Sequence, residues 1–160
     1  MADGARMTPV EEFRYLVLAV QREGNRLLAR RLRTVGLTPS QAEVLRVLQD
    51  RAPLMLSDLG ELLVCETGTS PSRLVDRLVL AGLVSRDVGT DRRSVRLGLT
   101  PEGERKVRQV EDAERALYDE LTPLLEGGHL DETLSTLRAV AGAFPAGRAV
   151  ALRAGRPVAG

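Results

Sequence analysis

Two short stretches in the middle of the chain, residues 84–88 and 95–99, constrain the fold more than any other feature. In residues 95–99 valine and leucine alternate with arginine and glycine, the two-residue periodicity of a half-buried strand. The link between the stretches, residues 89–93, has the sequence GTDRR and the composition of a hairpin turn. Because the rest of the chain has helical periodicity, the sequence predicts a mainly α fold with one small β-hairpin wing.

A long amphipathic helix is predicted near the N-terminus. Thr8, Pro9 and Glu11 have the spacing of a capping box with proline at the first helical position. Behind them, apolar or small residues recur at steps of three and four as far as about Arg33: Val10, Phe13, Val17, Val20, Gly24 and Leu27. A seam of about seven turns needs a second long helix to cover it. We therefore expect a partner helix or a partner chain.

Three shorter helices are predicted before the hairpin. Thr38 and Gln41 repeat the capping signature and open a helix that ends near Asp50, and Ser57 can cap a short third helix. The fourth helix ends at Gly82. Its apolar side carries Leu74, Val75, Leu78 and Ala81, and its opposite side carries Ser72, Arg73, Asp76, Arg77 and Leu80. Two helices joined by a turn and followed by a hairpin are the order of a winged helix-turn-helix.

Pro71 decides where the fourth helix begins. If Ser70 is the N-cap, Pro71 takes the first helical position, where its missing N–H costs nothing, and the helix is short. If Thr67 is the cap instead, Pro71 falls after the first turn, loses a backbone hydrogen bond and strains the helix. Which residues before Ser72 contact bases therefore stays open at this point.

The C-terminal part of the chain is also helical. Thr100 and Pro101 open a helix that matches the first in length, the Gly127-Gly128 pair ends it, and residues 130–144 form a last amphipathic helix. The predicted organisation is an N-terminal dimerisation helix in residues 1–34, a winged helix-turn-helix DNA-binding region in 35–100, C-terminal dimerisation helices in 101–144 and a disordered tail in 145–160. The tail is rich in glycine, alanine, proline and arginine.

The composition excludes several classes of function. One cysteine, Cys65, and one histidine, His129, cannot form an internal disulfide or a Cys/His zinc site, so we expect no metal and no other cofactor. No run approaches the roughly 18 apolar residues of a membrane helix, and no signal peptide is evident, so we expect a cytoplasmic protein. We find no nucleophile paired with a base and no glycine-rich phosphate loop, and expect no enzyme.

Charge and aromatic content indicate duplex DNA as the partner. Residues 69–99 contain six arginines and three aspartates, whereas residues 100–134 contain ten carboxylates and four basic residues. Aromatic residues make up 2% of the chain, too few for a platform that stacks single-stranded bases. A basic segment followed by an acidic helix fits a protein with one face on phosphate groups.

Eight residues, around the start of the fourth helix and in the hairpin turn, are candidate DNA contacts: Thr69, Ser70, Ser72, Arg73, Arg77, Asp91, Arg92 and Arg93. A helix fits the major groove, where Arg73 can donate two hydrogen bonds to guanine and Ser72 can adapt to either base edge. An arginine of the hairpin turn, Arg92 or Arg93, can enter the narrow minor groove of A·T-rich DNA.

At these residues the sequence resembles the MarR (multiple antibiotic resistance regulator) family. The segments SRLVDRLVLAGLVSR and DRRSVRLGLTPEGE carry the resemblance, which covers about residues 10–144. It implies a homodimer joined by its N- and C-terminal helices, usually a repressor that releases DNA when a small aromatic or anionic ligand binds. It also implies that Asp91 holds Arg93 in the minor groove. From the two-fold symmetry of such a dimer we expect an inverted-repeat operator.

Other interpretations stay open. Cys65 precedes the fourth helix, whose N-terminus could lower the thiol pKa and make it a redox sensor, or it is an apolar filler whose neighbour Glu66 opposes the thiolate. A winged helix used only for protein contacts would lack an arginine-rich turn. Four residues of the first helix could line a pocket for an anionic ligand or form a solvated face, and we assign none of them: Arg14, Tyr15, Arg22 and Arg26.

Overall fold

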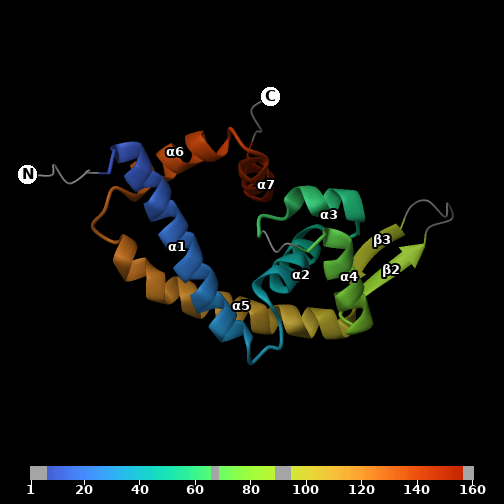
Figure 1. The fold of residues 1–160 in the computed structure, drawn as a ribbon. Helices are drawn as coiled ribbons and strands as arrows, with labels where there is room; N and C mark the ends of the chain where they lie inside the picture. The colour runs from blue at the N-terminus through green and yellow to red at the C-terminus, as the bar shows by residue number, and fades with distance from the viewer. Residues whose placement is uncertain (1–6, 66–68, 89–94, 157–160) are drawn as a thin grey trace, which may run out of the picture.

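The computed structural model describes residues 7–65, 69–88 and 95–156, and its elements follow the predicted order (Figure 1). The helices are α1 (Pro9–Leu32), α2 (Pro39–Arg51), α3 (Leu56–Leu62), α4 (Pro71–Leu80), α5 (Pro101–Leu125), α6 (Leu130–Ala141) and α7 (Pro145–Arg153). The strands are β1 (Leu54–Met55), β2 (Val84–Val88) and β3 (Val95–Leu99). The prediction of a mainly α fold with a small β wing is confirmed. Within the described ranges, no helix has the length and apolar character to cross a membrane.

Hydroxyl side chains start the first two helices where the sequence predicted. The Thr8 hydroxyl oxygen accepts the Glu11 N–H at 3.3 Å, and the Glu11 carboxylate accepts the Thr8 N–H at 2.7 Å. Thr38 and Gln41 form the same pair of bonds at the start of α2. Each box satisfies two N–H groups that would otherwise lack a partner near a helix N-terminus. These local bonds explain why the helix starts can be recognised from sequence.

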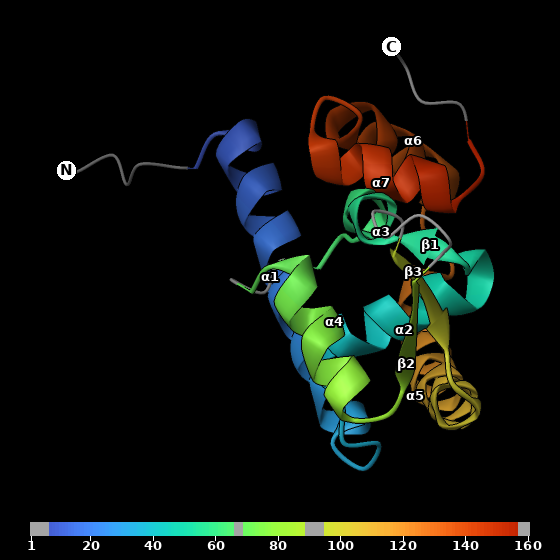
Figure 2. The same cartoon turned by 90° about the vertical axis from the view of Figure 1, so that its right-hand side faces the viewer.

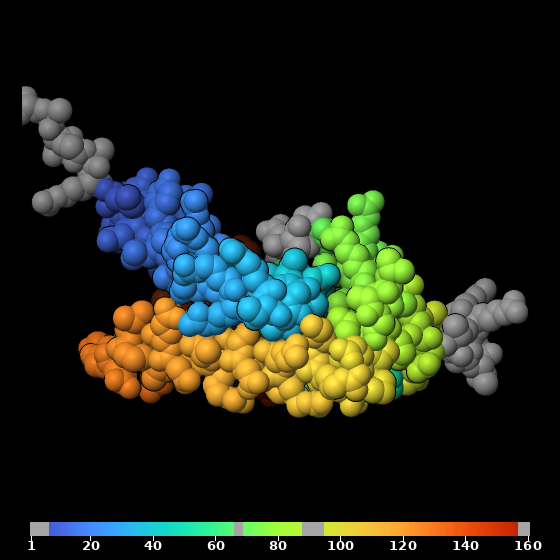
Figure 3. Space-filling view, turned by 90° about the horizontal axis from the view of Figure 1, so that it is seen from below, coloured from blue at the N-terminus to red at the C-terminus, as the bar shows by residue number. Residues whose placement is uncertain are grey.

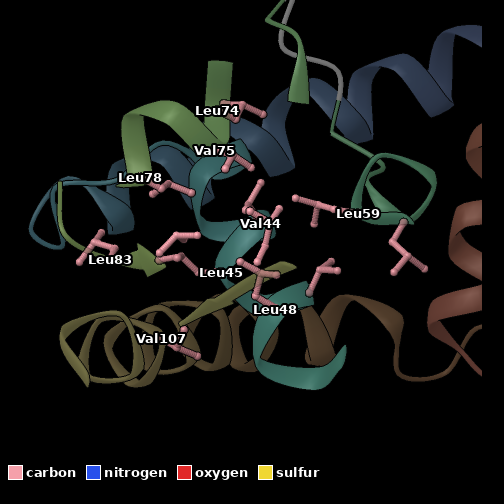
Figure 4. Close-up of a cluster of buried hydrophobic side chains, with 13 residues drawn as sticks. Val44, Leu45, Leu48, Leu59, Leu74, Val75, Leu78, Leu83 and Val107 are labelled. Atoms are coloured by element: carbon pink, nitrogen blue, oxygen red, sulfur yellow. The ribbon is translucent and has the colours of Figure 1, made fainter. Parts of the chain in front are cut away.

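The core of residues 39–99 surrounds α2. We call residues 39–99 the reader. Figure 4 shows α2 at the centre, with Val44, Leu45 and Leu48 pointing toward buried side chains of neighbouring elements, among them Leu59, Leu74, Val75, Leu78, Leu83 and Val107. Fully burying one leucine or valine side chain is worth about 1.5–3 kcal/mol. This core therefore holds α2, α3, α4, the sheet and the start of α5 as one unit.

The wing belongs to a three-stranded antiparallel sheet of strand order β1-β3-β2, whereas the sequence predicted two strands. β2 and β3 pair as predicted, and β1 adds Leu54 opposite the buried Leu97. A strand of two residues has no periodicity, so the sequence could not reveal it. The prediction that Ser57 caps the third helix is wrong, because α3 already begins at Leu56.

α1 packs against α5, which runs along the length of the molecule (Figure 3). At the C-terminal end of α1, Leu32 is fully buried in a small cluster with Val110 of α5. Nearby, the Lys106 ammonium donates to the carbonyl oxygen of Val35 at 2.6 Å. Farther toward the N-terminus this cover is lost, and Val20 of the predicted seam is 75% exposed. One chain alone therefore covers only one end of α1.

Residues 145–153 form α7, so the prediction of a disordered tail over 145–160 is wrong for these residues. Residues 157–160 lie outside the described part of the chain. α7 lies beside α3, and its Ala149 is 2% exposed (Figure 2). The glycine and proline content indicated disorder, but Pro145 occupies the first helical position and alanine, the best helix former, recurs behind it.

Candidate nucleic-acid interface

α4 has a polar face on the side opposite the core of the reader. Leu74, Val75 and Leu78 are buried, and helical spacing leaves Arg73 and Arg77 exposed. Figure 2 shows α4 at the surface of the reader. Neither arginine forms an ion pair with any residue that the structure describes. Both guanidinium groups are therefore available to a molecule outside the chain.

α4 begins as the Ser70 cap predicts. The Ser70 hydroxyl accepts the N–H of Arg73 at 3.5 Å, and Pro71 occupies the first helical position. The hydroxyl oxygens of Ser70 and Ser72 lie 3.1 Å apart, and half-buried Thr69 precedes them in a bend. Five sequence-predicted contact residues thus lie on this helix or just before it. Backbone N–H groups at a helix N-terminus also favour anions such as phosphate.

An ion pair connects α4 to the wing. The Asp76 carboxylate accepts a hydrogen bond from the guanidinium of Arg86, on β2. Arg73 and Arg77 lie closer to Asp76 along the chain, but neither is its ion-pair partner. The observed pair neutralises the one carboxylate on this face and links two elements that both lie at the proposed DNA surface. Arg86 is a residue of the site that sequence periodicity did not identify.

The turn of the wing holds the other three candidate contacts, Asp91, Arg92 and Arg93, and these lie outside the described residues. The stem of the wing is described: β2 and β3 pair from Val84 opposite Leu99 to the far end of the strands. The stem lies at one end of the molecule, beside α4 (Figure 1). The roles of the three turn residues stay predictions.

The environment of Cys65 opposes a redox role. Its backbone N–H donates to the Glu43 carboxylate at 2.8 Å, and its side chain is half-buried. Burial, followed by the negative charge of Glu43, raises the pKa of the Cys65 thiol to about 11. A reactive cysteine needs a lowered pKa, because the thiolate is the nucleophile. This environment favours the interpretation of Cys65 as an apolar filler.

The four residues of α1 that could line an anion pocket are all exposed in the single chain: Arg14, Tyr15, Arg22 and Arg26. The Arg14 guanidinium lies 5.0 Å from the centre of the Tyr15 ring, and Arg26 lies 3.8 Å from Glu23. His129 is the N-cap of α6 and is exposed. Across residues 7–65, 69–88 and 95–156, no group of three histidine, cysteine or acidic side chains could hold a metal ion.

Comparison with known proteins agrees with this geometry. A family model described as a winged helix DNA-binding domain matches residues 37–103. No curated protein gives a significant sequence match. Among solved structures, a MarR-family transcriptional regulator from Silicibacter pomeroyi is 27% identical over 87% of this chain and 92% of that chain, with a TM-score of 0.65.

Two similar structures contain DNA. A mutant of MarR from E. coli, complexed with operator DNA, is 27% identical over 82% of this chain and 94% of that chain, with a TM-score of 0.72. The transcriptional repressor CouR, bound to a 23-mer DNA duplex, is 25% identical over 87% of this chain and 99% of that chain, with a TM-score of 0.73. The similarity thus extends over the reader and most of the flanking helices.

Proposed function

Because this chain belongs to the MarR family of winged-helix transcription regulators, we propose that it binds an inverted-repeat operator as a homodimer and represses transcription there. Members of this family are DNA-binding transcription regulators and not enzymes. The observation that carries the proposal is the exposed face of α4, where Arg73 and Arg77 have no ion-pair partner within the described residues.

The first turn of α4 supplies the proposed base contacts. Residues at the N-terminal end of a recognition helix are the ones that approach base edges in the major groove. Arg73 is assigned to a guanine, through two hydrogen bonds, and Ser72 to a neighbouring base edge. Thr69, Ser70 and Arg77 are assigned to phosphate groups, which orient the helix on the duplex.

The wing supplies the proposed minor-groove contact. Arg93 enters the groove and Asp91 holds its guanidinium in position, while Arg92 contacts the backbone or takes the place of Arg93 in the groove. A narrow A·T-rich minor groove has an enhanced negative potential that attracts arginine. The Asp76–Arg86 pair supports this assignment, since it connects the wing stem to α4 on the same side of the reader.

A second copy of the chain is proposed to cover the apolar seam of α1. Val10 is 79% exposed, and the next three apolar residues of the seam, Phe13, Val17 and Val20, are exposed as well. Two recognition helices of such a dimer lie about 34–36 Å apart, one turn of DNA, so the operator should be an inverted repeat. Footprinting should show two protected half-sites, and protection of a single asymmetric half-site at saturating protein would contradict the dimer.

Duplex binding by alanine variants tests the assignments. The operator is first obtained from genomic fragments that the protein retains. Arg73→Ala should cost about 1–3 kcal/mol on the operator and leave random duplex nearly unchanged, because a base contact is lost. Arg93→Ala should weaken binding to all duplexes and reduce the salt dependence by about one charge per wing. Asp91→Ala should reproduce part of that loss, since a free arginine must be ordered on binding.

Controls separate DNA binding from the rival functions. Arg22→Ala removes an exposed arginine outside the reader and should leave both affinities unchanged. A winged helix that only contacts proteins should not bind duplex DNA at any salt concentration, which would refute the proposal. Equal losses on operator and random DNA for Arg73→Ala and Arg93→Ala would make both residues phosphate anchors and refute the assignment of Arg73 to a base.

Release of the operator by a ligand is the remaining part of the proposal. We expect a small aromatic or anionic compound to lower operator affinity by binding the dimer more tightly when it is free of DNA. A panel of aromatic carboxylates, added to the preformed complex at constant ionic strength, tests the class of ligand. If no compound of the panel changes the affinity for the operator, this class of ligand is rejected.

A further inference from the structure

Glu43 is a charged side chain in the interior of the reader. It lies on α2, the central helix, and is 8% exposed. A carboxylate is costly to remove from water, so a buried one needs hydrogen-bond donors and a cation around it. The partners of Glu43 therefore identify the parts of the fold that it holds together.

Three donors from the described residues surround the Glu43 carboxylate. The backbone N–H groups of Val64 and Cys65 donate to Oε1 at 2.9 Å and to Oε2 at 2.8 Å. Nη1 of Arg153, at the end of α7, donates to Oε1 at 2.6 Å. Val64 and Cys65 follow α3 and precede α4, so they belong to the turn of the helix-turn-helix. One carboxylate thus connects α2, this turn and the C-terminal helix.

α7 has further contacts at both of its ends. The Arg51 guanidinium donates to the carbonyl oxygen of Leu152 at 2.8 Å, and the Leu152 side chain packs against the core of the reader. At the other end, a Cβ atom placed on Gly147 would lie 1.9 Å from the carbonyl oxygen of Ala141, the last residue of α6. The backbones of α6 and α7 therefore approach closely at this corner, with no room for a side chain at residue 147.

We propose that Arg153 is a positioning residue for operator binding: through Glu43 it holds the turn before α4, and it couples the α6–α7 corner to the DNA-contacting helix. The inference rests on the proposed contact of α4 with DNA. α7 lies beyond α3 and not on the exposed face of α4, so Arg153 acts without touching DNA (Figure 2).

The neighbouring cation does not replace Arg153. Arg46 lies in the same interior, but its guanidinium is paired with Glu111 at 2.6 Å and with Glu114 at 3.1 Å. Burial raises the pKa of Glu114, and Arg46 and then Arg153 act against that rise. Without Arg153, Glu43 would keep its two backbone donors and lose its only cation within the described residues. The hydrogen bonds to the turn would then depend on a buried Glu43 carboxylate whose charge no cation compensates.

Affinities of full-length variants for operator and random duplex test the proposal. Arg153→Ala should weaken operator binding at least about fivefold, the lower end of typical coupling between distant sites. Affinity for random duplex should change less than about twofold, because the phosphate contacts are intact. Arg153→Lys should recover most of the loss because it keeps the cation. Arg148→Ala, an exposed arginine of the same helix without an ion-pair partner in the described chain, should bind like the wild type.

Amide hydrogen exchange gives a readout that needs no DNA. The N–H groups of Val64 and Cys65 should exchange faster in Arg153→Ala than in the wild type and stay unchanged in Arg148→Ala. If the alanine variant does not fold, Arg153→Gln takes its place, because it is a milder substitution that also removes the charge. It should show both the weaker operator binding and the faster exchange.

Three results would overturn the inference: wild-type operator affinity in a folded Arg153→Ala or Arg153→Gln protein, equal losses on operator and random duplex, or unchanged exchange at both amides. A wild-type protein that binds no duplex at low salt would instead refute the proposed function, and with it the operator part of the inference. The exchange measurement would then still decide whether Arg153 holds the turn. The two failures are therefore distinguishable.

Discussion

The reader and the long helix α1 carry the same kind of pattern, with apolar residues at steps of three and four, but one chain buries them to different extents. In the reader, Val44, Leu45 and Leu59 are all 0% exposed. In the seam of α1, Val10 is 79% and Val20 is 75% exposed. The reader is thus complete within one chain, and the seam of α1 is not.

The difference teaches what helical periodicity predicts and what it leaves open. The period shows that a helix has an apolar face, but not whether that face is covered by the same chain or by another. Exposed large apolar residues extend over α1 and over α6, where Leu130 and Val140 are among them. A contiguous apolar patch on a globular protein marks an interaction surface. The comparison therefore divides the molecule into a reader whose core is buried within one chain and helices whose apolar faces one chain leaves exposed.

Charges placed in the seam should have the largest effect. The double variant Val17→Glu, Val20→Glu would bring four carboxylates into the apolar interface of a dimer, and each buried unpaired ion costs several kcal/mol. The dissociation constant of the dimer should rise at least about 1,000-fold. Sedimentation velocity over a range of protein concentrations measures it. Leu80→Glu, at an exposed leucine of α4, is the matched control and should stay dimeric, whereas an unchanged dimer in the double variant would refute the seam as the interface.

A cavity in the reader should destabilise the protein in a different way. Leu78→Ala removes a side chain that is fully buried in the core, which should lower the free energy of unfolding by about 2–5 kcal/mol. The loss should be independent of protein concentration when measured by urea unfolding of the seam variant, at concentrations where sedimentation finds it monomeric. Leu80→Ala, two residues away and 91% exposed, should stay within about 0.5 kcal/mol of its parent. Similar losses for the two substitutions would contradict the assignment of the α4 faces.

The sequence predicted those parts of the fold that depend on neighbouring residues. The bonds of Thr8, Thr38 and Ser70 reach only three residues along the chain, so the starts of α1, α2 and α4 could be located from spacing alone. The exposed face of α4 follows from the period of its leucines and valines. The strands of the wing stem were recognised in the same way, from an alternation that needs no tertiary information.

The parts that were missed depend on contacts between distant residues. Glu43 and Arg153 are separated by 110 positions, and no local pattern connects them. Arg73 and Arg77 lie closer to Asp76 in the sequence, yet its partner is Arg86, on strand β2 of the wing stem. The biased composition of residues 145–160 predicts disorder, whereas α7 lies against α3 and buries Ala149. Tertiary contacts decided each of these cases.

The reactivity of the Cys65 thiol tests whether its side chain is buried in the folded reader. Because its pKa is raised from the ordinary 9.0 to about 11, the thiolate fraction at pH 8 should be about 100-fold lower than for a free thiol. Alkylation by iodoacetamide should be slower by about that factor in the folded protein and normal in urea. The stabilisation linked to this shift is present below pH 9 and is lost as the pH rises through about 11. Rapid peroxide oxidation at neutral pH would instead support the redox interpretation.

The smallest effect is expected on the outer face of the reader, at the pair of Asp76 and Arg86. Both side chains are substantially exposed, so breaking the pair should change the free energy of unfolding by at most about 1 kcal/mol. The two halves of the pair should nevertheless act on DNA binding with opposite signs. Asp76→Asn frees a positive charge beside α4, so affinity for random duplex and its dependence on salt should both increase, by about one charge per reader. Arg86→Ala leaves a carboxylate facing the phosphates and should weaken the same binding. Salt titrations of the two variants measure the difference, and weaker binding in both would show that the pair positions the wing instead of neutralising the face.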